Sequence, residues 1–329
     1  MPIVRAIRLE ADSRCQLHCP LCATGDGRNR HGVVGWGYLT LQNFERILDL
    51  NPAIERVELS NWGEILLNPE LELIIRRAHD RRIGLTARNG VNFNRVPRSV
   101  LVAMVEYGFR HLTISIDGAT QAVYEQFRRG GRLENVLNNI RALNQLKAAR
   151  SATYPELRWQ FIAFGHNEHE IERAQAMALE LGMEFYVKLN ATADYSPVSA
   201  RDLVSRSSGT GAASRAEFRQ LTGRPYSLPC GQLTEEPQLN WDGVVLGCCR
   251  NRTVALGDAL ATPIEACQRS EAYEKTLRIA DGADKEPEGT PCADCGIYRA
   301  EILPRVVAAR TRRRSSNGSG NYIDARETN

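Results

Sequence analysis

The stretch VRAIRLEADSRCQLHCPLC, residues 4–22, joins an apolar run to three closely spaced cysteines. The run from Val4 to Leu9 predicts a short β-strand. Cys15, Cys19 and Cys22 follow it directly, with the spacing Cys-x3-Cys-x2-Cys. Three thiolates at this spacing can bind three corners of a [4Fe–4S] cube and leave its fourth iron without a protein ligand. The stretch therefore predicts an iron–sulfur site in the loop after the first strand.

A zinc site is the alternative interpretation of this motif. Structural zinc requires four ligands in a closed tetrahedron, and the motif supplies three thiolates. His18 could complete the set, but ligation by His18 and the adjacent Cys19 together would be strained. Three buried thiols without a metal are the remaining alternative. Disulfides are not expected, because the chain has nine cysteines, an odd number, and we expect it in a reducing compartment.

Strand-like and helix-like segments alternate over the first two-thirds of the chain. Strands are predicted at residues 4–9, 56–59, 83–86, 112–116, 159–164 and 185–189, and helices at residues 41–50, 71–81, 99–107, 133–149 and 171–181. This alternation indicates βα units around a parallel sheet. Six units are too few for a closed eight-stranded barrel. We therefore expect an α/β fold, a partial (β/α)6 TIM-like barrel over residues 1–195, with its site at the carboxyl ends of the strands.

The rest of the chain has a different character. Residues 196–224 are rich in Ser, Gly, Ala and Arg and predict a linker or mobile loop. Residues 225–305 hold the other six cysteines among short strands, which predicts a small module organised by metal. Residues 306–329 are expected to form a basic, disordered tail, and a nucleic-acid-binding arm is the less favoured interpretation.

The charge and hydropathy of the chain limit its partners. The net charge is +3, with basic residues spread along the sequence, so no nucleic-acid partner is expected. No apolar run approaches the ~20 residues that span a bilayer, and the N-terminus lacks a signal-peptide core. These features predict a cytoplasmic protein without a membrane partner.

The cysteine motif at the end of the first strand of a βα series resembles that of the radical S-adenosylmethionine (SAM) superfamily. The resemblance implies that the open iron binds the amine and carboxylate of SAM. One electron from the reduced cluster then breaks the sulfonium bond, and the 5′-deoxyadenosyl radical abstracts a substrate hydrogen. Leu21 departs from the family, which often has an aromatic residue there, but leucine still supplies an apolar wall.

The same resemblance implies residues that contact SAM. Gly63 and Glu64 follow the second strand and match a Gly-Glu segment that contacts the SAM amine in the family; a turn glycine and an exposed glutamate are the alternative. Ser115 and Asp117 end the fourth strand, where the family places ribose or carboxylate contacts, or they simply cap a hydrogen-bonded strand end. Arg128 is a candidate for a bidentate pair with the SAM carboxylate, or a solvated helix arginine.

Other polar residues near strand ends are candidates for a substrate cavity. Arg88 lies where related enzymes often have Thr-Asn-Gly, and its guanidinium would suit an anionic substrate. The further candidates are Gln160, Asn167 and Lys188. Satisfied or surface positions are the alternative for each, and we assign no catalytic acid or base among them.

The C-terminal cysteines form a second pattern. Asp242-Gly243 predicts a tight hairpin turn that carries Cys248 toward Cys230, and Cys292 and Cys295 supply two further thiolates. On spacing alone the four could hold zinc or a [4Fe–4S] cluster. The order Cys, Gly-x4-Cys and Cys-x2-Cys resembles the SPASM or shortened twitch extension of radical SAM enzymes. That resemblance implies one auxiliary [4Fe–4S] cluster, used for electron transfer or tuning.

Cys249 and Cys267 remain outside this set. Buried apolar thiols are the favoured interpretation. Cys249 could instead replace Cys248 as a ligand, or the two thiols could bind a soft centre such as trivalent arsenic.

The predicted function is radical SAM chemistry on a small-molecule substrate of the natural-product or sugar type, since similar twitch-bearing enzymes dehydrogenate aminocyclitols. One alternative is transfer of a 3-amino-3-carboxypropyl group from SAM to arsenite, as in arsinothricin biosynthesis. A further alternative is a peptide-modifying SPASM enzyme, which is less favoured because no peptide-binding winged domain is recognisable before Cys15. The last is a zinc-stabilised binding module without activity. A flavodoxin or ferredoxin-type reductant is expected, because the sequence shows no flavin-binding motif.

Overall fold

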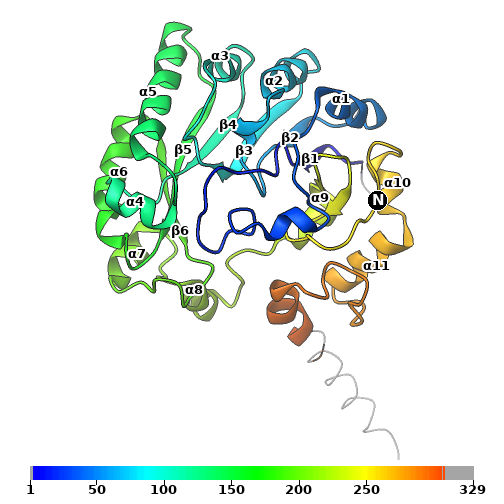
Figure 1. Cartoon of the computed structure of the whole chain (residues 1–329). Coiled ribbons are helices and arrows are strands. Elements are labelled where there is room, and N and C mark those ends of the chain that lie inside the picture. The colour runs from blue at the N-terminus through cyan, green and yellow to red at the C-terminus, as the bar shows by residue number, and fades with distance from the viewer. Residues whose placement is uncertain (1–2, 306, 308–329) are drawn as a thin grey trace, which may run out of the picture.

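The computed structural model describes residues 3–305 and residue 307 (Figure 1). Among them, eight strands form one sheet in the order β6-β5-β4-β3-β2-β1-β7-β8. The strands are β1 (Ala6–Leu9), β2 (Arg56–Glu58), β3 (Gly84–Val91), β4 (His111–Ser115), β5 (Glu156–Ala163), β6 (Glu184–Leu189), β7 (Gln238–Leu239) and β8 (Val245–Gly247). Neighbours from β1 to β6 run parallel, which confirms the predicted α/β partial barrel. The predicted tail, residues 306–329, lies outside the described residues except for Val307.

Helices cover the outer face of the curved sheet (Figure 1). They are α1 (Leu41–Leu50), α2 (Leu71–Asp80), α3 (Arg98–Glu106), α5 (Leu133–Ala149) and α6 (Ile171–Glu180), with the short α4 (Gln121–Phe127) before α5. Helix α1 shows why these segments are helical. Phe44, Ile47 and Leu48 are buried at helical spacing, and the side chain of Thr40 caps the first turn by accepting a hydrogen bond from Asn43 N.

Alternate residues of each strand face the apolar core or the barrel interior. On β5, Trp159 and Phe161 are fully buried in the core between sheet and helices. The residue between them, Gln160, instead bonds across the interior to Ser115 of β4 and to Lys188 of β6. The apolar core therefore lies between the sheet and the helices. The interior of the barrel is polar, and side chains from different strands contact each other in it.

The hairpin predicted in the C-terminal part of the chain forms, and it extends the barrel sheet. β7 pairs in parallel with β1, and β8 pairs antiparallel with β7. Gly243 N donates to Asn240 O at 3.0 Å, and the φ of Gly243 is 89°, a left-handed turn conformation that favours glycine. The elements around the hairpin are η4 (Pro229–Gly231), α9 (Gln232–Glu235), α10 (Ile264–Gln268), α11 (Glu271–Ala280) and η5 (Tyr298–Ile302). Through β7 and β8, the C-terminal region of residues 225–305 is joined to the barrel sheet.

The segment 196–224, expected to be a linker or mobile loop, contains two helices instead, α7 (Arg201–Ser207) and α8 (Arg215–Thr222). Ser214 caps α8 by accepting a hydrogen bond from Glu217 N. Val204 and Ala212 are fully buried in the main core. The Ser- and Gly-rich composition indicated a loop, but these few apolar contacts and the cap order the segment.

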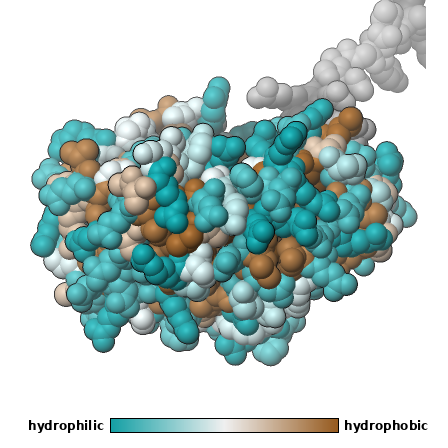
Figure 2. All heavy atoms as spheres, turned by 90° about the horizontal axis from the view of Figure 1, so that it is seen from above, coloured by the Kyte–Doolittle hydropathy of each residue, from teal (hydrophilic) through white to brown (hydrophobic). Residues whose placement is uncertain are grey.

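Apolar residues on the surface are scattered among hydrophilic ones on the face shown in Figure 2. Within the described part of the chain, no helix is both long enough and apolar enough to cross a membrane.

Candidate active site

The three N-terminal cysteines lie in the loop between β1 and α1, which crosses the open end of the barrel (Figure 1). Cys19 is buried, and Cys15 and Cys22 are partly buried. Leu17 N donates to Cys15 Sγ at 3.4 Å, and Asn92 Nδ2 donates to the same sulfur at 3.6 Å. Hydrogen bonds to cysteine sulfur are among the contacts by which proteins tune iron–sulfur clusters.

The surroundings of these thiols are apolar. Cys19 belongs to a buried group with Leu17, Phe127 and Phe164, and Cys15 and Cys22 pack against that group. Burial is the main cause that raises the pKa of Cys15 to about 12; Glu64, Cys19 and Cys22 raise it further. Thiols in such a place become ligands by losing their protons to a bound metal.

The fit of a cluster rests on this donor set. The three thiols come from one short loop, the other two raise the pKa of Cys15, and Cys15 Sγ accepts two N–H donors. Among residues 3–305 and 307, no group of three or more His, Cys, Asp or Glu side chains is arranged to hold a single metal ion. Three thiolates from one loop are the donor set that binds a [4Fe–4S] cube at three corners, and the residues present fit this group.

Gly63 and Glu64 lie directly against the backbone of the cysteine loop. A Cβ atom at Gly63 would lie 2.1 Å from Asp12 O and 2.6 Å from Arg14 O, so only glycine fits there. Glu64 N donates to Arg14 O at 2.7 Å. The Glu64 side chain is 1% exposed, which excludes the exposed glutamate considered above, and burial raises its pKa to about 7. Its carboxylate accepts hydrogen bonds from the backbone N–H groups of Leu66 and Asn92.

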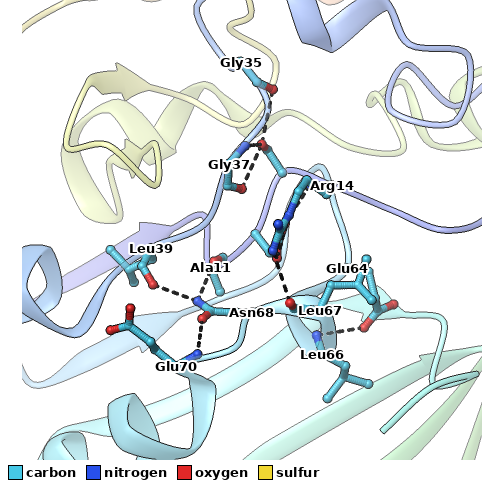
Figure 3. Close-up of polar contacts among 12 residues, drawn as sticks. Ala11, Arg14, Gly35, Gly37, Leu39, Glu64, Leu66, Leu67, Asn68 and Glu70 are labelled. Atoms are coloured by element: carbon cyan, nitrogen blue, oxygen red, sulfur yellow. Dashed lines mark hydrogen bonds and ion pairs between the residues drawn. The ribbon is translucent and has the colours of Figure 1, made fainter.

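Figure 3 shows how this loop and the 3-10 helix η2 (Ile65–Leu67) are tied together. Arg14 pairs with Asp12, at 2.7 Å between Nη2 and Oδ2, and also donates to Leu67 O at 3.2 Å. Asn68 Nδ2 donates to Ala11 O at 2.8 Å and to Leu39 O at 2.9 Å. These bonds hold the entry and exit of the cysteine loop against the end of β2.

Asp117 and Arg128 form a buried ion pair beside the cysteines. Asp117 is fully buried; its Oδ2 lies 2.6 Å from Arg128 Nε, and its Oδ1 accepts a hydrogen bond from Ile162 N at 2.6 Å. Arg128 also opposes the effect of burial on the Cys19 pKa, so the guanidinium lies close to Cys19. Arg128 is therefore not a solvated helix arginine. Ser115 lies on the same strand end and accepts a hydrogen bond from Gln160.

Glu10 is a buried acid that sequence reasoning missed. It follows β1, is fully buried, and accepts hydrogen bonds from Trp62 N at 2.9 Å and Gly63 N at 3.1 Å. Burial raises its pKa to about 8. The sequence signal that could have identified Glu10 is an acidic residue directly after a buried parallel strand. Active-site residues of barrel folds lie at this end of the strands. Glu10 therefore positions the Gly63–Glu64 segment.

The raised pKa of Glu10 predicts a pH-dependent stability. A carboxyl group with a higher pKa in the folded than in the unfolded state lets the folded protein hold more protons. The free energy of unfolding then falls as pH rises from about 4.5 to about 8. Gln cannot ionise, so Glu10→Gln should gain stability relative to wild type by up to about 1.4 kcal/mol per pH unit in this window. Urea unfolding from pH 5 to 8 measures this difference.

The matched control is Glu106→Gln, since Glu106 is an exposed acid at the end of α3. It measures the effect of the same substitution at an exposed acid, and the Glu10→Gln curve is compared with it. If the free energies of unfolding of Glu10→Gln and wild type changed in parallel from pH 5 to 8, the prediction that Glu10 is protonated in the folded protein would be wrong.

The second set of cysteines, Cys230, Cys248, Cys292 and Cys295, comes from three places in the chain. Cys230, Cys292 and Cys295 pack around the buried group of Ile279, Tyr298 and Ile302. Burial raises the pKa of Cys230 to about 11 and those of Cys248 and Cys292 to about 12. Cys295 raises those of Cys230 and Cys292 further, and Cys292 raises that of Cys248.

Cys249 and Cys267 lie in different surroundings. Cys249 N donates to Gln232 Oε1 at 2.9 Å, and its thiol raises the pKa of the neighbouring Cys248. Cys267 is buried within α10, with its Sγ 3.3 Å from Thr262 Oγ1. The structure thus places Cys249 beside the second set and Cys267 in the core of the C-terminal region.

The candidate substrate residues separate into three places. Gln160 and Lys188 meet inside the barrel, 3.2 Å apart. Asn167 is fully buried. Its Nδ2 donates to Asp117 O and Ile162 O, and its Oδ1 accepts a hydrogen bond from Phe164 N. Asn167 therefore stabilises a loop and does not face a cavity. Arg88 lies within β3, because that strand continues past Thr86 to Val91.

Two cavities are relevant to these residues. The first, about 570 Å³, lies over the cysteine loop and is lined by Cys15, His18, Thr24, Asp26, Arg30 and Trp36 among others. The second, about 400 Å³, is lined by Arg88 together with residues at the starts of β4, β5 and β6. Arg88 therefore faces the opposite end of the barrel from the cysteines, away from Lys188.

A partial barrel with three cysteines in the loop after its first strand is the architecture of an iron–sulfur enzyme. Residues 12–179 match the model of the Radical SAM superfamily, and the chain belongs to that superfamily. It is therefore an enzyme, and membership implies a [4Fe–4S] cluster and SAM as its cofactors.

Solved structures of similar fold belong to radical SAM enzymes. Streptococcus suis SuiB bound to S-adenosylmethionine matches with a TM-score of 0.62 and 13% identity, over 90% of this chain and 71% of that chain. The enzyme anSMEcpe, with bound SAM and the Cp18Cys peptide, matches with a TM-score of 0.57 and 14% identity, over 92% of this chain and 88% of that chain. At these identities the likeness shows the fold alone. No curated protein matches the sequence significantly.

Proposed function

We propose that this enzyme cleaves SAM to a 5′-deoxyadenosyl radical that abstracts hydrogen from a small-molecule substrate of the natural-product or sugar type. The observation that carries the proposal is the grouping of Cys15, Cys19 and Cys22 beside the buried Glu64 and the Asp117–Arg128 pair. When bound by these thiols, a [4Fe–4S] cluster supplies the electron that breaks the sulfonium bond. The protein's own residues bind SAM, orient it and exclude water.

The roles of these residues follow from charge and burial. The Glu64 carboxylate influences the pKa of Cys15, so it lies where it can receive the SAM ammonium beside the thiols. Arg128 supplies a guanidinium beside Cys19 for the SAM carboxylate, and Asp117 fixes its orientation. Phe127 and Phe164, with ring centroids 4.6 Å apart, form an apolar wall that excludes water from the same place.

The C-terminal thiols support an auxiliary cluster of the SPASM or twitch type. Cys230, Cys248, Cys292 and Cys295 form one mutually interacting set, and four thiolates would complete the coordination of a cube. Such a cluster has no open iron for substrate, which suits it to accept or tune an electron. A flavodoxin or ferredoxin-type reductant and a cytoplasmic location belong to the same proposal.

Peptide modification is the second candidate. It is favoured by the structures of SuiB bound to its precursor peptide SuiA and of anSMEcpe with a peptide, whose folds this chain shares. Transfer of a 3-amino-3-carboxypropyl group to a thiophilic acceptor such as arsenite is a further alternative. It differs in the carbon–sulfur bond of SAM that breaks.

One anaerobic preparation tests these alternatives. The proposal expects a brown protein with about eight irons per chain, four for each cube, and 5′-deoxyadenosine after reduction with SAM. About four irons would reject the auxiliary cluster alone. 5′-Methylthioadenosine as the product would indicate the transfer reaction. A colourless protein with about two zinc ions would reject the enzyme proposal in favour of a zinc-binding module.

A further inference from the structure

Two cations face the interior of the barrel at its β6 side. Lys188 lies on β6, and its Nζ donates to Gln160 Oε1 at 3.2 Å. Arg215 is the first residue of α8, and its Nε donates to Leu189 O at 3.0 Å. Burial lowers the pKa of Lys188 to about 8, and the charge of Arg215 is the next cause. Arg215 thus bonds to the backbone of Leu189, the residue next to Lys188 on β6.

Arg215 is held in place by an aromatic wall. Its guanidinium carbon lies 4.8 Å from the centroid of the Tyr226 ring. The hydroxyl of Tyr226 is 2.8 Å from that of Tyr186, the residue two positions before Lys188 on β6. The Tyr226 ring holds the Arg215 guanidinium near the Lys188 ammonium. The two positive charges repel each other, and an anion bound between them would offset this repulsion.

Neither cation has a carboxylate partner among the residues that the structure describes. Asp117 is the carboxylate that acts on Lys188. Both of its oxygens are already engaged, by Arg128 Nε and by Ile162 N. Two partly buried like charges without an ion-pair partner of their own are costly, so the pair suits a site for an anion.

Lys188 lies within electrostatic reach of groups at both cysteine sites. Lys188 is influenced by Arg128 and Asp117, which adjoin Cys19, and by Cys249, which adjoins Cys248. A molecule bound at Lys188 would therefore lie near both the SAM site and the C-terminal thiols. This is the position that a substrate needs if it gives a hydrogen atom to one site and an electron to the other.

Resting on the function proposed above, we infer that the substrate carries an anionic group, a carboxylate or a phosphate, that binds between Lys188 and Arg215 inside the barrel. The ammonium supplies a compact charge and the guanidinium a planar fork, and both suit oxyanions. Gln160 acts as a positioning residue, because its Oε1 accepts from Lys188 while its Nε2 donates to Ser115.

The test uses the anaerobically reconstituted full chain with inorganic phosphate and, separately, acetate as probes. Thermal unfolding is followed against probe concentration at constant ionic strength, for wild type, Lys188→Met and Arg215→Gln. Lys285→Met is the matched control, since Lys285 is exposed in the C-terminal region. Wild type and the control should show a saturating rise in melting temperature. The two site variants should need more than tenfold higher probe concentration for the same rise.

The two probes also separate the two chemical classes, because a preference for phosphate over acetate indicates a phosphorylated substrate and the reverse a carboxylate. Without probe, Lys188→Met should melt at or above the wild-type temperature, since it removes a partly buried charge. Such a melting temperature shows that the variant is folded. Equal responses of wild type and both site variants would overturn the inference.

Failure of the anion site can be distinguished from failure of the proposed function. SAM cleavage to 5′-deoxyadenosine by wild type in the absence of substrate tests the proposed function by itself, because that reaction needs no substrate anion. If wild type itself cleaves no SAM, the proposed function is rejected, and the probe titration still decides whether the anion site exists.

Discussion

Replacing Cys19 with Ala is expected to abolish SAM cleavage and to lower the iron content by about four atoms per chain. Cys19 is the buried member of the N-terminal set, in contact with the Phe127–Phe164 wall. Two remaining thiols cannot hold three corners of a cube. The loss of one sulfur from this packed place should cost only about 1 kcal/mol of folding free energy, so the variant should still fold. Product formation, iron content and thermal unfolding together measure these effects.

The matched comparison is Cys292→Ala, which removes a buried thiol from the C-terminal set. It should also lose about four irons, yet retain SAM cleavage without turnover of substrate. The two variants therefore separate the functions of the two sets. Full cleavage activity in Cys19→Ala would contradict the assignment of the N-terminal cysteines, and persistent turnover in Cys292→Ala would contradict electron transfer by the auxiliary site.

The elements that sequence predicted best are those with strong local signals. The predicted helices at residues 41–50 and 133–149 agree with α1 and α5 to the residue. In α1, Thr40 gives the start, and the apolar spacing gives the length and buried face. The hairpin turn at Asp242-Gly243 was also predicted from a local signal, the two turn residues themselves. Because parallel strands order themselves along the chain in βα folds, the barrel followed from these elements.

The predictions that differed from the structure depended on contacts distant in sequence. β3 extends to Val91, and part of this extension pairs with Ile114 of β4 after a register shift, so Arg88 lies within a strand. Residues 196–224 contain the helices α7 and α8, and Val204 and Ala212 anchor the segment in the core. Neither the extension of β3 nor the anchoring of residues 196–224 in the core can be predicted from amino-acid composition.

The candidate site shows the same division. The cysteine spacing and the Gly63–Glu64 segment were recognisable as motifs. The partners that orient them were not, because Glu10 bonds to residues more than fifty positions away and Asp117 reaches both Arg128 and Ile162. Glutamate after a buried strand and arginine at a helix end are ordinary residues until the fold brings their partners close.

Replacing Gly63 with Ala is expected to lower the rate of SAM cleavage by about 100-fold or more. The new Cβ would overlap Asp12 O at 2.1 Å and Arg14 O at 2.6 Å, both backbone atoms that cannot rotate away. The Gly63–Glu64 segment must then move off the cysteine loop, which breaks the bonds from Gly63 N to Glu10 and from Glu64 N to Arg14 O. Displacement of a binding group by about 1 Å is enough for such a loss.

The same overlap should lower the free energy of unfolding by about 1–3 kcal/mol, as overpacking in a tight interior does. Gly84→Ala is the matched control, because the nearest atom to a Cβ there is Arg110 Cγ at 3.7 Å, an ordinary contact. Cleavage rate and urea unfolding should be close to wild type in the control. If Gly63→Ala loses stability but cleaves SAM at the wild-type rate, the close approach of this segment to the cysteine loop supports the fold and plays no part in binding SAM.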